Sequence, residues 1–338
     1  MALVYGICGC SMMGSEDYVV GVDGGASKTV ALVGTADGKI LGRGSADSSN
    51  YHNVGSSAAS EAIRTAVLQA KQNAGLHATR LGTAIVALAA IDSANDAKEA
   101  TRFVRQKQLA KSSFAIHDSV AALYAATRGE PGIIVNSGTG CFAAGTSRAR
   151  RYVRVGGWGN LIDDKGSAYD IGMKAITLGF RMVDGRTPRT NLMSLVKRGL
   201  GVKMFDEIQD LVYVQRIGVD KIARLAPLVS RAAIRDKVCQ NILKDAGLSL
   251  AELVCTAARE LQLTRKQFVI YTTGGGFKAG RYLLNPFTSE VKKVCPHARI
   301  KGLETEPVKG AFWLAGELSR RGLHSKPGGW VKLSSAIP

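Results

Sequence analysis

Two glycine-rich stretches decide the fold of this chain: Asp23-Gly24-Gly25-Ala26-Ser27-Lys28-Thr29 and Asn136-Ser137-Gly138-Thr139-Gly140. Each stretch lies between two β-like runs, and a third β-like run follows it. These runs cover residues 18–23, 29–35 and 38–46 around the first stretch, and residues 132–136, 141–146 and 152–156 around the second. The repeated order of strand, glycine turn, strand, turn and strand predicts an internal duplication.

Both turns have the composition of phosphate-binding turns. Glycine lets backbone N–H groups approach phosphate oxygens, and a hydroxyl residue inside the turn adds a donor. Two ordinary tight hairpins are the alternative, but a Ser or Thr in both turns favours two hairpins that grip one polyphosphate. The candidate residues are Gly24, Gly25, Ser27, Lys28, Ser137, Gly138, Thr139 and Gly140. The P-loop spacing is absent, so Lys28 is either a phosphate contact or a solvated charge.

Length and composition indicate a globular α/β protein of two domains. The chain has 338 residues, of which 46% are hydrophobic and 39 are glycine. No apolar run is long enough to span a bilayer, so no membrane partner is expected. The formal net charge of +18 would suit nucleic acid, but the basic residues are dispersed and only 6% of residues are aromatic. We therefore expect no nucleic-acid partner, and either attraction of an anionic nucleotide or a general adaptation of the host proteome explains the charge more simply.

The cysteines indicate the cellular compartment, and both ends of the chain are expected to lie outside the folded domains. Six cysteines include no C-x-x-C pair, which favours buried thiols in a reducing cytoplasm, with a disulfide through Cys239 or Cys255 as the alternative. Residues 1–15 are expected to be an extension that lacks the basic start of a secretory signal, and Met12 or Met13 could be the true start. Residues 323–338 are expected to form a loosely held basic tail.

Two aspartates carry the candidate chemistry. Asp118 follows a predicted strand, residues 113–117, and opens a predicted helix. The carboxyl ends of strands hold ligands in open α/β sheets, so Asp118 could accept the proton of a substrate hydroxyl that attacks phosphorus. A simple helix N-cap is the alternative role. Asp23 ends the first strand and could hold Mg²⁺ through water, or could satisfy its own turn.

Three further segments are candidates for ligand contacts. The triple glycine Gly274-Gly275-Gly276 follows a predicted strand and suits close approach of a ribose or base, or a plain strand–helix turn. Trp158, among glycines, could stack on a sugar or pack in the core. Of the adjacent Asp163 and Asp164, one could bind a sugar hydroxyl and the other cap the following helix. Residues 190–262 read as almost wholly helical.

Taken together, these pieces resemble a known family. The chain is similar to the N-acetylglucosamine kinase and BadF/BadG/BcrA/BcrD-type ATPase group of the acetate-kinase and actin superfamily, and looks closest to the archaeal broad-specificity hexokinases. The matching pieces occur in order from about residue 18 to residue 322. They are residues 22–29, 49–55, 117–118, 129–132, 136–140, 156–159, 164–169 and 306–311.

The resemblance implies a duplicated ribonuclease-H-like fold of the actin/hexokinase type, with ATP and sugar in a cleft between two domains. The first domain would cover residues 16–131 with a returning helix at 307–322, and the second residues 132–306 with a helical insertion at 190–262. ATP phosphates would lie at the two turns, and the nucleoside at Gly275 and Gly276. Asp118 would be the base for the sugar 6-hydroxyl. Asn50, Asp118, Gly157, Trp158 and Asp164 would contact the sugar.

The predicted function is therefore ATP- and Mg²⁺-dependent phosphorylation of the 6-hydroxyl of a hexose or hexosamine: glucose, mannose, glucosamine or N-acetylglucosamine. Lys165 stands where many relatives of the N-acetylglucosamine branch carry Glu, so the preferred sugar stays open. Relatives commonly form homodimers, which is the expected assembly. The alternatives are a BadF-type ATPase that activates a partner dehydratase through an iron–sulfur cluster, and a sugar-responsive regulator. Cys141 is in a family-like place but lacks a paired cysteine, and no DNA-binding motif precedes the fold.

Overall fold

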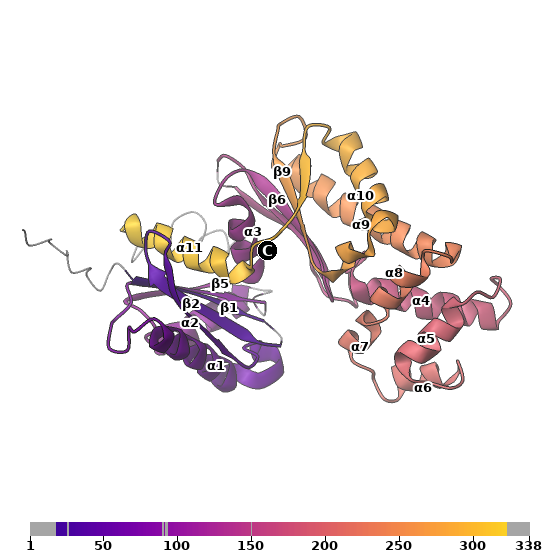
Figure 1. The fold of residues 1–338 in the computed structure, drawn as a ribbon, viewed down its shortest axis with the longest axis horizontal. Coiled ribbons are helices and arrows are strands. Elements are labelled where there is room, and N and C mark those ends of the chain that lie inside the picture. Colours follow the sequence, from indigo (N-terminus) through magenta and orange to yellow (C-terminus); the bar gives the residue numbers. More distant parts are fainter. Residues whose placement is uncertain (1–17, 26, 90, 92–93, 150, 323–338) are drawn as a thin grey trace, which may run out of the picture. The chain divides into compact units, whose positions relative to one another are not determined.

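The chain divides into two compact units, and the computed structural model describes residues 18–25, 27–89, 91, 94–149 and 151–322 (Figure 1). The first unit is Met1–Ala125 with Glu306–Pro338, and the second is Ala126–Thr305. The predicted extension 1–15, the tail 323–338 and Ala26 of the first turn lie outside the described residues.

A five-stranded mixed sheet forms the centre of the first unit. Its strands are β1 (Tyr18–Gly24), β2 (Thr29–Thr35), β3 (Ile40–Ala46), β4 (Thr83–Leu88) and β5 (Ser112–His117). They lie in the order β3-β2-β1-β4-β5. The first three strands pair antiparallel, whereas β4 is parallel to β1 and β5 is parallel to β4. The carboxyl ends of β1, β4 and β5 therefore meet at one edge.

Helices cover both faces of this sheet. They are α1 (Tyr51–Asn73), α2 (Ala94–Gln106), α3 (Asp118–Thr127) and α11 (Pro307–Arg320). Val20 and Val22 of β1 share one apolar cluster with buried residues of α1 and α2. Gly21 faces the opposite side of β1 from Val20 and Val22. It lies against α11: a Cβ on Gly21 would be 2.0 Å from the Phe312 backbone nitrogen. The last helix thus returns to the first unit and packs directly on β1 (Figure 1).

The sheet of the second unit repeats the topology of the first. Its strands are β6 (Gly132–Ser137), β7 (Cys141–Thr146), β8 (Tyr152–Gly156), β9 (Val269–Thr273) and β10 (Arg299–Gly302). Their order is β10-β9-β6-β7-β8. The pairs β6–β7 and β7–β8 are antiparallel, whereas the pairs β6–β9 and β9–β10 are parallel. Numbered within each unit, both sheets read 3-2-1-4-5. The predicted α/β class and the internal duplication are confirmed.

Helices make up most of the remaining second unit. They are α4 (Ala168–Val183), α5 (Leu192–Leu200), α6 (Glu207–Tyr213), α7 (Val219–Ala223), α8 (Ala226–Ala232), α9 (Lys237–Glu260), the 3₁₀ helix η2 (Gly275–Ala279) and α10 (Arg281–Val294). The predominantly helical character predicted for residues 190–262 is therefore confirmed. The long α9 packs on β6, β7 and β8, and α10 packs on α9. Across the described ranges, none of the helices is both long and apolar enough to cross a membrane.

Residues 45–55 have the polar, glycine-containing composition typical of a loop, yet a helix begins within them. The helix begins at Tyr51 and is interrupted at Gly55, whose φ of 79° and ψ of 155° are not helical. Asn50 caps it: its side-chain oxygen accepts the His52 N–H at 3.1 Å. A polar sequence that contains glycine does not by itself predict a helix. This first turn forms because the Asn50 side chain accepts a backbone N–H that has no partner within the helix.

Candidate active site

Asp118 lies at the carboxyl edge of the first sheet, directly after β5 and at the start of α3. The Nδ1 atom of the buried His117 lies 2.9 Å from Asp118 Oδ1 and also accepts the Ser119 N–H at 3.0 Å. The Asp118 side chain is one-third exposed. The carboxylate therefore lies against the His117 ring on the protein side and is partly exposed on the other.

Asp23, at the end of β1, lies near the Asp118 carboxylate. The pKa of Asp23 is raised to about 6, chiefly by burial and then by the negative charges of Asp118 and Glu306, while Lys28 acts in the opposite direction. The structure thus brings together two carboxylates that the sequence places 95 positions apart. Perturbed acids of this kind are typical of functional sites.

The first glycine turn packs against the loop that leads into α1. A Cβ on Gly24 would lie 2.3 Å from Ser49 Oγ, so only glycine fits there. Ser48 donates its hydroxyl to the Gly25 carbonyl at 3.3 Å, and Gly25 N–H closes the turn on the Lys28 carbonyl at 3.0 Å. Asn50 therefore directly follows Ser48 and Ser49, the two residues that contact the first glycine turn. Ser27 and Lys28 are exposed.

The second glycine turn is tied to the start of α4. Gly138 N–H donates to the Gly140 carbonyl at 2.9 Å, and the Gly138 carbonyl accepts the Ala168 N–H at 2.8 Å. Ser137 is fully buried and donates to the Gly166 carbonyl at 2.8 Å, so its hydroxyl is engaged within the protein. Thr139 is exposed.

Asp164 also lies against this second turn. Its Oδ1 accepts the Cys141 N–H at 3.4 Å, and its Oδ2 would be 2.9 Å from a Cβ on Gly140. Burial is the main cause that raises the pKa of Asp164. Its carboxylate therefore supports the turn, in addition to any contact with a ligand. The helix cap that the sequence assigned to Asp163 or Asp164 is provided by Ser167, which accepts the Asp170 N–H.

The triple glycine packs on the same turn. A Cβ on Gly276 would lie 2.0 Å from Ser137 Oγ, and one on Gly274, where φ is +94°, would lie 2.3 Å from the Ser137 carbonyl oxygen. Gly275 is different, because no atom lies within 4 Å of the position a Cβ would occupy. The structure thus joins the second turn to Gly274 and Gly276 and leaves Gly275 facing open space.

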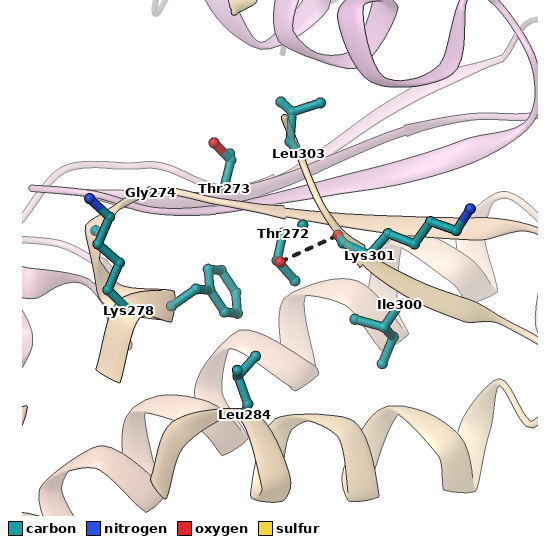
Figure 2. Close-up of a pocket in the computed structure, with 11 residues that line it drawn as sticks. Thr272, Thr273, Gly274, Lys278, Leu284, Ile300, Lys301 and Leu303 are labelled. Carbon is teal, nitrogen blue, oxygen red and sulfur yellow. Dashed lines mark hydrogen bonds between the residues drawn. The ribbon is translucent and has the colours of Figure 1, made fainter. Parts of the chain in front are cut away.

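A cavity of about 700 Å³ opens beside Gly274 and Gly275 (Figure 2). Its apolar walls come from η2, α10 and the end of β10, and Lys278 and Lys301 lie at its margins. Figure 2 shows Leu284 of α10 opposite the end of β9, where Thr272 donates to the Lys301 carbonyl at 3.4 Å. The lining residues are Thr272, Thr273, Gly274, Gly275, Phe277, Lys278, Leu284, Ile300, Lys301, Gly302 and Leu303. A cavity of this size and composition suits a small organic ligand.

Trp158 lies on the surface of the second unit rather than in its core, with 47% of the residue exposed. The Arg154 guanidinium lies 5.8 Å from the centre of the Trp158 ring and donates to the Gly156 and Gly157 carbonyls. Arg154 therefore fixes both the ring and the backbone before it. An exposed, pre-positioned aromatic ring is suited to contact with a ligand.

The described cysteines, Cys141, Cys239, Cys255 and Cys295, are free and buried. Burial raises the pKa of each thiol, and Cys141 donates to the Lys165 carbonyl at 3.2 Å. The alternative of a disulfide among these four residues is therefore wrong. Cys8 and Cys10 lie outside the described residues.

Sequence reasoning missed three residues that contact the candidate residues or carry charge near them, two in the first unit and one in the second. Ser49 packs on Gly24, and Glu306, which forms an ion pair with Arg43 at 2.8 Å, contributes charge around Asp23. Arg154 positions the Trp158 ring. Ser49 and Glu306 belong to the motifs that carry the resemblance, which was the available signal. No sequence motif indicated Arg154, because its role depends on its contacts with Gly156, Gly157 and the Trp158 ring in the folded chain.

Two curated relatives and one solved structure resemble this chain over most of its length. An N-acetylmuramic acid/N-acetylglucosamine kinase of Clostridium acetobutylicum is 28% identical over 299 residues, which cover 88% of this chain and 98% of the relative. An N-acetyl-D-glucosamine kinase of Dictyostelium discoideum is 27% identical over 313 residues, 89% and 98% of the two chains. The structure of a candidate N-acetylglucosamine kinase from Chromobacterium violaceum superposes with a TM-score of 0.71 at 25% identity, covering 88% of this chain and 98% of that one.

The family itself is shown by a match along nearly the whole described chain. The model of the BadF/BadG/BcrA/BcrD ATPase family matches residues 20–315, a span that includes both glycine turns, Asp118 and the first part of the returning helix α11. The family expected from the sequence motifs is thereby confirmed. This chain belongs to the BadF/BadG/BcrA/BcrD ATPase family.

Proposed function

We propose that this protein is a sugar kinase, which transfers the γ-phosphoryl group of ATP to the 6-hydroxyl of a hexose or hexosamine. The observation that carries the proposal is the pair of carboxylates, Asp23 and Asp118, beside a glycine turn at the carboxyl edge of the first sheet. Membership in an ATPase family and curated relatives named N-acetylglucosamine kinases support it.

Asp118 is the proposed catalytic base. The sugar oxygen attacks the γ-phosphorus, the bond from that phosphorus to the bridging oxygen breaks, and ADP leaves with the bridging oxygen. The hydroxyl proton passes to the Asp118 carboxylate, which is partly exposed and lies against His117. Asp118 directly follows a strand and begins a helix, so its backbone is held at a fixed place on the sheet edge.

The two glycine turns are the proposed phosphate contacts. Backbone N–H groups and the exposed hydroxyls of Ser27 and Thr139 would stabilise charge on the transferring group. The cavity beside Gly275 is the proposed nucleoside site, because its apolar walls suit a base and its two lysines suit an anionic nucleotide. Ser137 and Gly276 hold this site and the second turn together.

The environment of Asp23 fits Mg²⁺. Its carboxylate is crowded by the negative charge of Asp118 and Glu306, and a divalent cation would relieve that crowding. When bound there, Mg²⁺ would neutralise charge on the β- and γ-phosphates. Asp23 is the residue that would hold it, either directly or through water.

The sugar contacts are proposed at Asn50, Asp118, Gly157, Trp158 and Asp164. The Asn50 oxygen caps α1, which leaves its amide N–H groups to donate to a sugar oxygen. Trp158 offers an exposed ring face that Arg154 holds in place. Arg154 thus acts as a positioning residue for the sugar site.

A coupled assay of ADP release tests the proposal. The protein is supplied with Mg²⁺ and ATP, and separately with glucose, mannose, glucosamine, N-acetylglucosamine or no sugar. We expect ADP release that depends on sugar, with a 6-phosphate as product by NMR. Equal ADP release in all wells, including the one without sugar, would instead indicate the activating ATPase, and no release with any sugar would contradict the kinase.

A further inference from the structure

The walls of the proposed nucleoside cavity suit the flat face of a nucleobase. Four partly exposed apolar side chains line it: Phe277, Leu284, Ile300 and Leu303. The Phe277 ring is fixed by an edge contact with the fully buried Phe287, whose ring centre lies 5.5 Å away. Contact with the face of a base does not depend on which base it is, because every base has an apolar π-face.

The polar side chains of this cavity can adapt to different bases. They are two threonines, Thr272 and Thr273, and two lysines, Lys278 and Lys301, which lie at its margins (Figure 2). A threonine hydroxyl can donate or accept a hydrogen bond as its hydrogen rotates. A lysine donates from a flexible stem, and adenine and guanine both carry acceptor atoms. These four side chains therefore fit more than one base edge.

Selection between adenine and guanine needs a more rigid partner. Adenine presents an amino donor where guanine presents a carbonyl acceptor, and a carboxylate or amide side chain in a fixed place tells them apart. The side chains of this lining are instead apolar, threonine or lysine. The Leu303 N–H and the Thr272 carbonyl are joined to each other at 2.8 Å, so they are engaged within the sheet. Apolar pockets reject similar ligands only weakly, by about 10²-fold at most.

We propose that this protein accepts nucleoside triphosphates as phosphoryl donors with little preference between adenine and guanine. This inference rests on the proposed function, which places the nucleoside in this cavity. The bond that breaks is the one between the γ-phosphorus and the bridging oxygen, and the nucleoside diphosphate leaves with that oxygen. The base takes no part in this step, and the cavity of about 700 Å³ admits either purine.

Calorimetric titration of the full chain with ADP, GDP and CDP, each with Mg²⁺, tests the proposal. We expect the Kd of GDP to lie within about tenfold of that of ADP, because the same apolar walls cover both purines. CDP should bind severalfold more weakly, since a smaller base covers less apolar surface.

The variant Leu284→Ala shortens one apolar wall and should weaken ADP and GDP by the same factor. Leu178→Ala is the matched control, because Leu178 of α4 is also a partly buried leucine but lies outside the cavity. It should leave both affinities unchanged. The sugar assay is then repeated with GTP in place of ATP, and turnover should again stay within about tenfold.

The outcomes separate this inference from the kinase itself. Similar binding of ADP and GDP without phosphorylation of any sugar supports the inference and contradicts the kinase. Sugar phosphorylation that falls by more than roughly 100-fold when GTP replaces ATP supports the kinase and overturns the inference. The inference is also overturned if neither diphosphate binds, if Leu284→Ala weakens only one of them, or if Leu178→Ala weakens both equally well.

Discussion

At the scale of single residues, Asp118 joins two roles that a substitution can separate. It begins α3 and it carries the proposed base. The variant Asp118→Asn keeps the shape and capping ability of the side chain but removes its basicity. We expect kcat to fall by ~10²–10⁴-fold with Tm and ATP affinity nearly unchanged, measured by the ADP assay, thermal unfolding and calorimetry. Asp245→Asn, the same change at an exposed position of α9, is the control, and full turnover in Asp118→Asn would remove Asp118 from the mechanism.

Asp23 predicts a dependence of stability on pH. Its pKa is about 6 in the folded protein, above the ordinary 3.8, so the folded state binds more protons than the unfolded state between these values. The contribution of Asp23 to stability is therefore present below about pH 4 and is lost as the pH rises through about 6, a change of roughly 3 kcal/mol.

The neutral variant Asp23→Asn lacks this loss. We expect its stability relative to wild type to increase from pH 4 to pH 8, measured by urea unfolding of both proteins at each pH. A relative stability that stays constant over this range would show that burial and the charge of Asp118 do not raise the pKa of Asp23.

At the scale of elements, the turn between β9 and η2 places two neighbouring glycines in different surroundings. A methyl group on Gly276 would collide with Ser137 Oγ, so Gly276→Ala should destabilise the protein by roughly 1–3 kcal/mol. A methyl group on Gly275 meets no atom, yet it would enter the proposed nucleoside cavity. We therefore expect Gly275→Ala to raise the KM for ATP severalfold at unchanged Tm, as measured by steady-state kinetics and thermal unfolding.

Gly218→Ala is the matched control, because Gly218 is also unobstructed and lies outside the cavity. If Gly275→Ala and Gly218→Ala share the same KM for ATP, the nucleoside does not approach the protein at Gly275.

The elements also show what sequence could predict. Alternation and glycine turns located β2, β7 and β8 to the residue, because these patterns are local. The first turn of α1 was missed, since it depends on a side-chain cap at Asn50. The contact of Gly276 with Ser137 joins segments far apart in the chain, so no local pattern contains it. The predicted site residues stay predictions until the variants are measured.

At the scale of the whole molecule, the chain order and the folding units do not coincide. The last described helix, α11, belongs to the first unit, where Phe312 is fully buried and Gly310 leaves no room for a Cβ against the Ala121 carbonyl. The second unit has an apolar core of its own. In the sequence, its residues come between the two segments that form the first unit. The first unit therefore needs residues from both ends of the described chain, whereas the second is continuous.

This arrangement predicts how fragments behave. Residues 126–305 alone should unfold cooperatively, because their core is complete, whereas residues 18–125 alone should not, because the face of β1 that packs on α11 is uncovered. Joining residues 306–322 to 18–125 through a flexible linker should restore a cooperative transition, measured by thermal melts in circular dichroism. The linked fragment is the control for the shortened one, since both contain the same sheet. Cooperative unfolding of residues 18–125 without the helix would show that α11 adds only to a unit that is already stable.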